Sequence, residues 1–213
     1  FLFLITSFLF LLPLWFIWKK IPEEKVTATI IDGIKKYKGL RTITFLEGSL
    51  HFFPSVIVAV YALLFFQQAS AVGWFLSYLA LISLGIAWFV SRHSDKTQQR
   101  KKHIFVLFLA LTASIISLAL VRSVIGWLVA VGIFTVIYAI SSPLRLAVSM
   151  DVKKIDLDFW KTREIFLNIG RAVTLSISAF LFYYQLYWPI FMMFALITLI
   201  YPFLVNYKLK EIK

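Results

Sequence analysis

The chain contains seven blocks of almost purely apolar sequence, each close in length to a helix that crosses a membrane. They cover residues 1–18, 42–66, 72–91, 103–121, 124–148, 161–184 and 187–206. Crossing about 30 Å of hydrocarbon takes roughly 20 helical residues. None of the blocks shows the two-residue alternation of a barrel strand, and a helix satisfies its own backbone hydrogen bonds in lipid. The sequence therefore predicts an all-α, polytopic helical membrane protein that contacts the lipid bilayer.

Composition excludes several other classes of protein. Hydrophobic residues make up 61% of the 213 residues and charged residues only 15%, too few to cover a soluble core. The chain has no cysteine, which excludes a disulfide framework, a thiolate metal site and a cysteine nucleophile. It also lacks the H-E-x-x-H motif, the nucleophile elbow and the glycine-rich phosphate loop. We therefore expect no enzyme activity, no cofactor and no metal ion.

The positive charge is distributed unevenly along the chain. The net charge is +12, and every basic residue except Arg122 lies in or near one set of alternate connections, at 19–41, 92–102, 145–171 and 208–213. The opposite connections, 67–71 and 183–189, have no charged residue. This is the positive-inside bias, so the basic connections and the carboxy terminus are predicted to be cytoplasmic. The charge thus indicates a plasma (inner) membrane protein rather than a protein that binds nucleic acid.

The blocks suggest four parts. Residues 1–18 have neither the basic start nor the cleavage site of a signal peptide, and are interpreted as the end of a transmembrane helix from an upstream half. Residues 19–41 form a cytoplasmic linker, in which Val26, Ile30, Ile34 and Tyr37 recur at the spacing of a helix on the membrane surface. A solvated linker is the alternative. Residues 42–207 form a six-helix bundle, and residues 208–213 a cytoplasmic tail.

A motif in the second cytoplasmic connection suggests a family. The stretch "GIAWFVSRHSDKTQQRKK" (85–102) has a glycine, then Asp95–Lys96, then a basic cluster that begins at Arg100. It resembles the loop signature of the major facilitator superfamily, although Gln98–Gln99 replace the second glycine of that signature and the spacing is looser. The stretch "REIFLNIGR" (163–171) is similar to the eleventh helix of some bacterial members. The resemblance implies the carboxy-terminal half of a twelve-helix transporter, with the amino-terminal half as its partner.

The same resemblance implies a set of gate residues. In that family the loop aspartate and nearby charged residues hold the inner gate shut. The matching positions of this chain are Gly85, Asp95, Lys96, Arg100, Arg145, Arg163 and Glu164. Near a solvated surface, each such ion pair would contribute only about 0–1 kcal/mol. The alternative is that these charges only orient the chain in the membrane.

Charged residues inside the predicted span 161–184 need an explanation of their own. Glu164, Asn168 and Arg171 are spaced i, i+4 and i+7, so they share one helix face. Arg171 lies about ten residues, or roughly 15 Å, from the start of its block. An arginine at that depth costs about 2.5–3.5 kcal/mol unless it faces protein or water. Lys161 and Arg163 are close enough to the start to extend to the cytoplasmic surface.

Glu47 and His51 are candidate partners for these charges, because they are i, i+4 neighbours in the first of the six spans. In the family resemblance, this helix and the helix of Arg171 both line the transport cavity. We therefore expect Glu47 or His51 to face Arg171 or Glu164 across a water-filled path. One interpretation is proton-coupled transport, with Glu47 and His51 as proton carriers and Arg171 as counter-charge. Cavity lining without proton coupling and a static packing network remain open.

The function predicted from these features is secondary transport of a small solute by alternating access. An integral-membrane enzyme or lipid-handling protein at the cytoplasmic face is the alternative, with Asp151, Asp156 and Asp158 as the only local group of acids. Two prolines, Pro54 and Pro143, are expected to kink their helices. Close helix contacts are expected at Gly73, Gly85, Gly126, Gly132 and Gly170.

Overall fold

The structure, a computed structural model, describes residues 33–35, 37–93, 100–152 and 157–211. Within these ranges every regular element is helical, which confirms the predicted all-α class. Six helices are long and apolar enough to cross a membrane, so the chain is a multi-pass membrane protein. The predicted upstream helix (1–18), most of the predicted linker (19–32) and the end of the tail lie outside the described residues.

The helix bounds follow the predicted blocks closely. The first span combines α3 (Arg41–Phe52), the π-helical turn η1 (Phe53–Ile57) and α4 (Val58–Ala62). The others are α5 (Ala69–His93), α6 (Arg100–Leu120), α7 (Val124–Val152), α8 (Leu157–Tyr183) and α9 (Tyr187–Glu211). Helix α7 ends later, and α8 begins earlier, than the apolar blocks predict. Polar residues extend both helices beyond the apolar sequence, so charges near these ends lie deeper in the bundle than expected.

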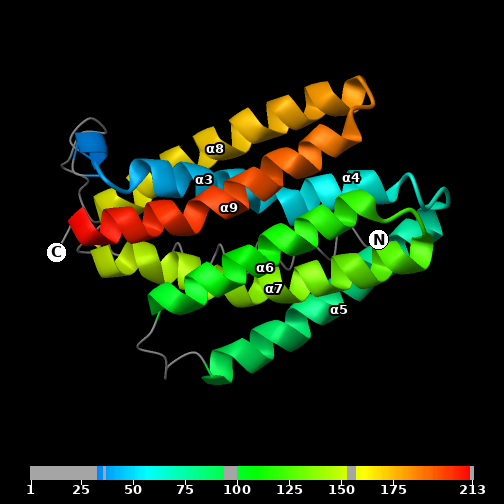
Figure 1. Cartoon of the computed structure of the whole chain (residues 1–213), viewed down its shortest axis with the longest axis horizontal. Coiled ribbons are helices and arrows are strands. Elements are labelled where there is room, and N and C mark those ends of the chain that lie inside the picture. Colours follow the sequence, from blue (N-terminus) through cyan, green and yellow to red (C-terminus); the bar gives the residue numbers. More distant parts are fainter. Residues whose placement is uncertain (1–32, 36, 94–99, 153–156, 212–213) are drawn as a thin grey trace, which may run out of the picture.

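The helices form two groups (Figure 1). Helices α3, α8 and α9 pack on one another, and α7 packs on both α5 and α6. Contacts of α9 with α6 join the two groups. The first three spans can be matched in order with the last three, so that the first span corresponds to α7, α5 to α8 and α6 to α9. The α3–α8 contact then corresponds to the α7–α5 contact, and the α6–α9 contact corresponds to itself. Because three crossings reverse the direction of the chain, an inverted repeat would produce this pairing of helices.

Helices α3 and α8 approach each other through two glycines. A Cβ atom on Gly48 would overlap the carbonyl oxygen of Leu167, and one on Gly170 would overlap that of Phe45. The hydroxyl of Ser49 donates to the Gly170 carbonyl oxygen at 3.4 Å. Small residues and hydroxyl groups drive helix association in membranes, where the hydrophobic effect between helices is absent. The expected close contact at Gly170 is confirmed, whereas the equivalent role of Gly48 is a finding of the structure.

The other glycines differ in their surroundings. A Cβ on Gly132 would overlap the Tyr78 hydroxyl, which donates a hydrogen bond at 3.2 Å to the Leu128 carbonyl oxygen where α5 meets α7. Gly73 and Gly85 have no atom of the described chain within 4 Å of such a Cβ, so the expected close contacts there are wrong. Both glycines belong to α5, whose apolar span is only 6% buried, because much of its surface faces away from the bundle.

The first span changes its helical pitch at Pro54. A proline lacks the N–H that an α-helix needs and its ring displaces the preceding turn. The chain accommodates it by a π-helical turn, after which the Val58 N–H donates to the Phe53 carbonyl oxygen. Such turns are often found at functional sites, and this one places Pro54 beside a cavity.

The two ends of the bundle differ in character. At the end that carries Arg41 and Lys161, called the basic end below, Tyr37 is buried, hydrogen-bonded to Thr44 at 2.9 Å and stacked on Phe166 of α8. Burial raises the pKa of Tyr37 above its usual 10.0 and outweighs the opposite effect of the hydrogen bond with Thr44, so the phenol remains neutral. Tyr37 therefore packs into the bundle instead of lying on a membrane surface.

The opposite end is closed by aromatic rings. Trp127 stacks on Phe65 with ring centroids 5.1 Å apart and meets Tyr61 at 4.9 Å, and Tyr61 also meets Phe191 at 4.8 Å. Trp127 is fully buried in this group. A tryptophan at a helix end commonly sits at the lipid headgroups. Here it fills the core between the first span, α7 and α9.

Candidate functional site

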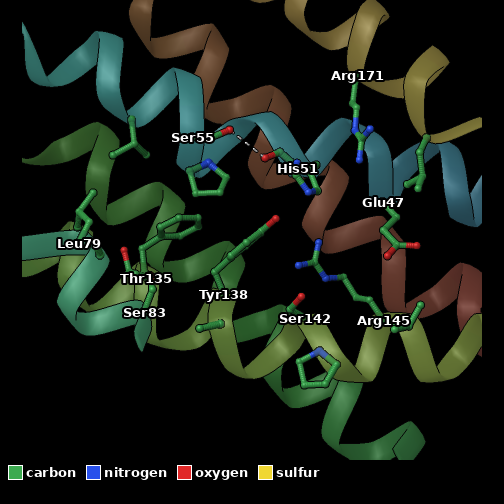
Figure 2. Close-up of a pocket in the computed structure, with 18 of the residues that line it drawn as sticks. Glu47, His51, Ser55, Leu79, Ser83, Thr135, Tyr138, Ser142, Arg145 and Arg171 are labelled. Atoms are coloured by element: carbon green, nitrogen blue, oxygen red, sulfur yellow. Dashed lines mark hydrogen bonds between the residues drawn. The ribbon is translucent and has the colours of Figure 1, made fainter. Parts of the chain in front are cut away.

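A cavity of about 760 Å³ lies between four of the six spans. Its walls come from the first span, α5, α7 and α8, whereas α6 and α9 contribute no lining residue. Figure 2 shows the labelled side chains of these helices around one open space. The charged and ionisable residues that line it are Glu47, His51, Arg145, Arg163, Glu164 and Arg171. Five of these six are acidic or basic side chains brought inside spans that are otherwise apolar.

A buried ion pair connects α3 with α8 at this cavity. The Arg163 guanidinium donates to Oε1 of Glu47 at 2.6 Å, and each residue is less than a tenth exposed. The sequence-based expectation that Arg163 extends to the surface is wrong. Helix α8 begins at Leu157, six residues before Arg163, so this side chain lies inside the bundle. The Arg163 guanidinium also lies 5.7 Å from the ring of Trp160.

Arg145 is buried in the cavity wall without an acidic partner. It is only 3% exposed, and among the described residues no carboxylate forms an ion pair with it. Its guanidinium carbon lies 4.5 Å from the centre of the Tyr138 ring, in the arrangement of a cation–π contact. The expected place of Arg145 in a surface latch does not match this burial. Helix α7 continues seven residues past it to Val152, which removes it from the helix end.

Arg171 points into the cavity (Figure 2), and its polar contacts are with residues of its own helix, α8. Its guanidinium donates to Oδ1 of Asn168 at 2.9 Å and lies 3.6 Å from a carboxylate oxygen of Glu164. The predicted shared face of Glu164, Asn168 and Arg171 is thus confirmed. Its partner on α3 differs from the prediction, since Glu47 pairs with Arg163 instead of Arg171. His51 and Arg171 nevertheless line the same cavity, whereas Asn168 is not one of its lining residues.

The remaining gate positions are placed only in part. Gly85 lies on the exposed side of α5 and away from the cavity. Arg100 is the first residue of α6, and its side chain is not among those described. Asp95 and Lys96 lie outside the described residues. The gate itself therefore remains a prediction.

Hydroxyl groups on α7 form a second polar part of the cavity that the sequence analysis missed. Thr135, Tyr138, Ser142 and Arg145 all line it. They are spaced by three, four and three residues, so they follow one face of the helix. This polar stripe inside an apolar block is a signal that the sequence already contained. It would have identified α7 as a cavity-lining helix.

The charges of the cavity do not balance. Three arginines and two glutamates line it, which gives an excess of one positive charge when His51 is neutral. Four charged side chains have a buried atom without a hydrogen-bond partner in the described structure: Glu47 Oε2, Arg145 Nε, Arg163 Nε and Arg171 Nε. Such atoms are costly unless water or a ligand satisfies them. The cavity wall therefore offers polar atoms that water or a polar ligand can satisfy.

No model of a known protein family matches the sequence, and no curated protein or solved structure matches it at a significant level. A search of the described residues finds no group of three or more acidic or histidine side chains that could hold a metal ion. Function must therefore be inferred from the cavity, its charges and the arrangement of its helices. These features suit binding of a hydrated or charged solute inside the membrane.

Proposed function

We propose that the chain is the carboxy-terminal half of a secondary transporter of the major facilitator type, which moves a small solute by alternating access. The observation that carries the proposal is the cavity of about 760 Å³, with five charged residues inside a bundle of candidate spans. Such charges are expensive in a membrane and are normally found on substrate or ion pathways. A purely structural bundle has no need of an open, charged space of this size.

Helix arrangement supports the same proposal. The pairing of α3 with α8 and of α7 with α5 is related by exchange of the two sets of three spans. Transporters with inverted repeats place their binding site where the repeats meet. Here the cavity is lined by both pairs, whereas α6 and α9 contribute no lining residue. The amino-terminal half would close the open side of this cavity.

Orientation of the bundle follows from its basic end. Arg41 and Lys161 lie where α3 and α8 begin, together with the basic connections of the sequence. We place this end in the cytoplasm, in accordance with the positive-inside bias. Asp95, Lys96 and Arg100 would then belong to the inner gate that the loop motif implies, with Gly85 in the helix that leads into it.

Coupling to protons is proposed through Glu47 and His51. Both line the cavity, and protonation of Glu47 would release Arg163 from its ion pair. A binding event that changes the α3–α8 contact would favour one of the two transporter states over the other. The ion pair thereby offers a link between a proton and a change in helix packing.

Reconstitution of the full-length protein in liposomes tests the proposal. Radiolabelled sugars, amino acids, carboxylates and phosphate would be offered with and without an inward proton gradient. Uptake of one solute class, above that of protein-free liposomes, is the expected result. Absence of uptake for every class would contradict a transport function.

The proton role needs a separate variant. Removing only one partner of a buried ion pair destabilises a protein, whereas replacing both partners is often tolerated. The double variant Glu47→Gln/Arg163→Gln should therefore fold and still take up solute, but without response to the proton gradient. His51→Gln tests the second carrier in the same way. If both variants keep the gradient response of the natural protein, transport is not proton-coupled through these residues.

A further inference from the structure

The most informative residue of the cavity is Arg145, the lining arginine that forms no ion pair among the described residues. Arg145 is 3% exposed and its Nε atom is buried without a hydrogen-bond partner in the described structure. The two glutamates of the cavity are engaged elsewhere, Glu47 by Arg163 at 2.6 Å and Glu164 by Arg171 at 3.6 Å. A buried cation is normally paired, because desolvation of an isolated charge is costly.

The surroundings of Arg145 hold its guanidinium in the cavity, and the nearby Glu47 carboxylate compensates its charge only in part because it is paired with Arg163. The ring of Tyr138 stacks against it at 4.5 Å, which orients the group but leaves the formal charge unchanged. Figure 2 shows the guanidinium projecting from α7 into the open space between Tyr138 and Glu47, with Arg171 entering from the opposite wall. The guanidinium groups of Arg145 and Arg171 therefore face one cavity from two helices.

We infer that the cavity binds an oxyanion, a carboxylate or phosphate group, on the guanidinium of Arg145. This inference rests on the proposed transport function and names the chemical class of its solute. A guanidinium presents several N–H donors in one plane, a geometry that matches the two oxygens of a carboxylate or phosphate. The bound oxyanion would supply the ion-pair partner that the described residues do not provide.

Arg171 would assist from α8. Its guanidinium is more exposed than that of Arg145 and is partly neutralised by Glu164, whose side chain is 53% exposed. Arg145 is therefore the primary contact and Arg171 a second, weaker one. Ser142, one helical turn from Arg145 on the same wall, adds a hydroxyl that can donate to the same oxyanion.

Direct binding measurements on the full-length protein test the inference. Phosphate salts stabilise most proteins without specific binding, so a shift in melting temperature alone is unsuitable. Radiolabelled inorganic phosphate would instead be bound to protein in phosphatidylcholine nanodiscs at constant ionic strength. Succinate should displace it, whereas succinamide, a neutral molecule of nearly the same shape, should not.

Variants assign the binding to a residue. Arg145→Gln should weaken phosphate binding roughly tenfold or more, as expected for loss of a hydrogen bond to a charged group. Arg145→Lys keeps the charge but not the planar donor array, so its affinity for phosphate should lie between those of the natural protein and Arg145→Gln. The matched control is Lys161→Gln, which removes one exposed positive charge of α8 outside the cavity and should bind like the natural protein.

Several results would overturn the inference. One is that the natural protein binds neither phosphate nor succinate in the assay. Others are that succinamide displaces phosphate as well as succinate does, or that both Arg145 variants bind phosphate like the natural protein. Equal loss of binding in Lys161→Gln would show that only overall charge matters. Arg145→Lys supplies the same test if Arg145→Gln does not fold, because it retains the buried charge.

A lipid headgroup is the second possible source of the oxyanion, and nanodiscs that contain phosphatidylglycerol distinguish it. If the transported solute carries the anion, phosphate binding persists in these nanodiscs. Its disappearance would assign the site to the headgroup and contradict a solute at Arg145.

Liposome uptake separates the oxyanion proposal from the transport proposal. Uptake of only neutral or cationic solutes would refute the oxyanion but retain transport. Arg145-dependent binding without any uptake would refute transport alone.

Discussion

Arg163 of α8 and Glu47 of α3 form a buried ion pair of 2.6 Å across a helix contact where Gly48 and Gly170 bring the two backbones close together. The pair lies one residue from Gly48, where the two backbones leave no room for a Cβ atom. An ion pair at such a contact is sensitive to small helix movements, because its geometry depends on both backbones. Three predictions on stability follow from this contact and its neighbours.

The first prediction is that either partner of the pair alone is costly to remove. Glu47→Gln leaves the Arg163 charge buried and unpaired, and Arg163→Gln does the same to Glu47. Each should lower the free energy of unfolding by about 3–5 kcal/mol. The double variant should lose clearly less than the sum of the two. Reversible unfolding in a denaturing detergent measures these differences.

A matched control for this prediction is Glu164→Gln. Glu164 also faces an arginine, Arg171, but at 3.6 Å and with a side chain that is 53% exposed. A solvated pair of this kind contributes only about 0–1 kcal/mol. Equal destabilisation by Glu47→Gln and Glu164→Gln would show that burial of the first pair is not what matters.

The second prediction concerns Arg145, which should behave opposite to Arg163. Replacement of an unpaired buried cation by an apolar side chain is often neutral or stabilising. The loss of its cation–π contact with Tyr138 would offset this by roughly 0.5–2 kcal/mol. Arg145→Met should therefore melt no lower than the natural protein without ligand, whereas Arg163→Met should melt clearly lower. A strong loss of stability in Arg145→Met would indicate a structural role for this arginine.

The third prediction concerns the two glycines of the α3–α8 contact. Gly48→Ala and Gly170→Ala each force a methyl group onto a backbone carbonyl of the facing helix. Overpacking of this kind costs roughly 1–3 kcal/mol, and the backbones have to separate. Both variants should therefore lower the melting temperature and weaken the Glu47–Arg163 pair.

Gly73→Ala is the control for these glycines. Gly73 is also within a helix, but a Cβ there meets no atom of the described chain within 4 Å. Alanine is favoured over glycine in a helix by up to about 1 kcal/mol. Gly73→Ala should thus be neutral or slightly stabilising. A similar loss in all three variants would refute specific packing at α3–α8.

The positions of the spans were predictable because the energy that determines them is local. A run of about 20 apolar residues has few alternatives to a membrane helix, whatever it packs against. Grouping of Glu164 and Arg171 on one face was predictable for the same reason, since helical spacing alone fixes it. Convergence of Glu47, His51 and Arg171 on one cavity was also expected, and the structure confirms it.

The choice of partner was not predictable, because it depends on how far each helix extends and how it is rotated. Helix α8 begins four residues earlier than predicted, so Arg163 lies in the interior instead of at the surface. There it forms the ion pair with Glu47 that was expected for Arg171. Gly48 gave no signal in the sequence, since its importance comes from a carbonyl oxygen of a helix more than a hundred residues away. Arg145 was predicted only as a gate residue, and its place in the cavity wall was recognisable only from the polar residues that share its face of α7.

The fourth prediction is that the cavity contains water. The 213 residues contain no cysteine, so a cysteine introduced into them is the only thiol of this part of the protein, and the unsubstituted protein measures the background reaction. Ser83→Cys and Ser142→Cys place a thiol in the cavity wall, whereas Ile177→Cys places one on an exposed apolar part of α8 outside it. A water-soluble maleimide requires the thiolate, which forms only in a hydrated site. The two serine variants should react much faster than Ile177→Cys, and inorganic phosphate should slow Ser142→Cys. Equal rates would show that the cavity is not hydrated.

The fifth prediction is the orientation of the bundle in the membrane. Lys38 is exposed at the basic end, and Gln68 is exposed in the connection between α4 and α5 at the opposite end. If the positive-inside bias applies, Gln68→Cys is labelled by a membrane-impermeant maleimide in intact cells. Lys38→Cys is then labelled only after the cells are permeabilised. Gln185→Cys, in the connection between α8 and α9, should behave like Gln68→Cys, because an even number of spans separates them. Labelling of Lys38→Cys in intact cells would invert the bundle and place the candidate gate on the outer face, which would contradict the proposed cytoplasmic gate.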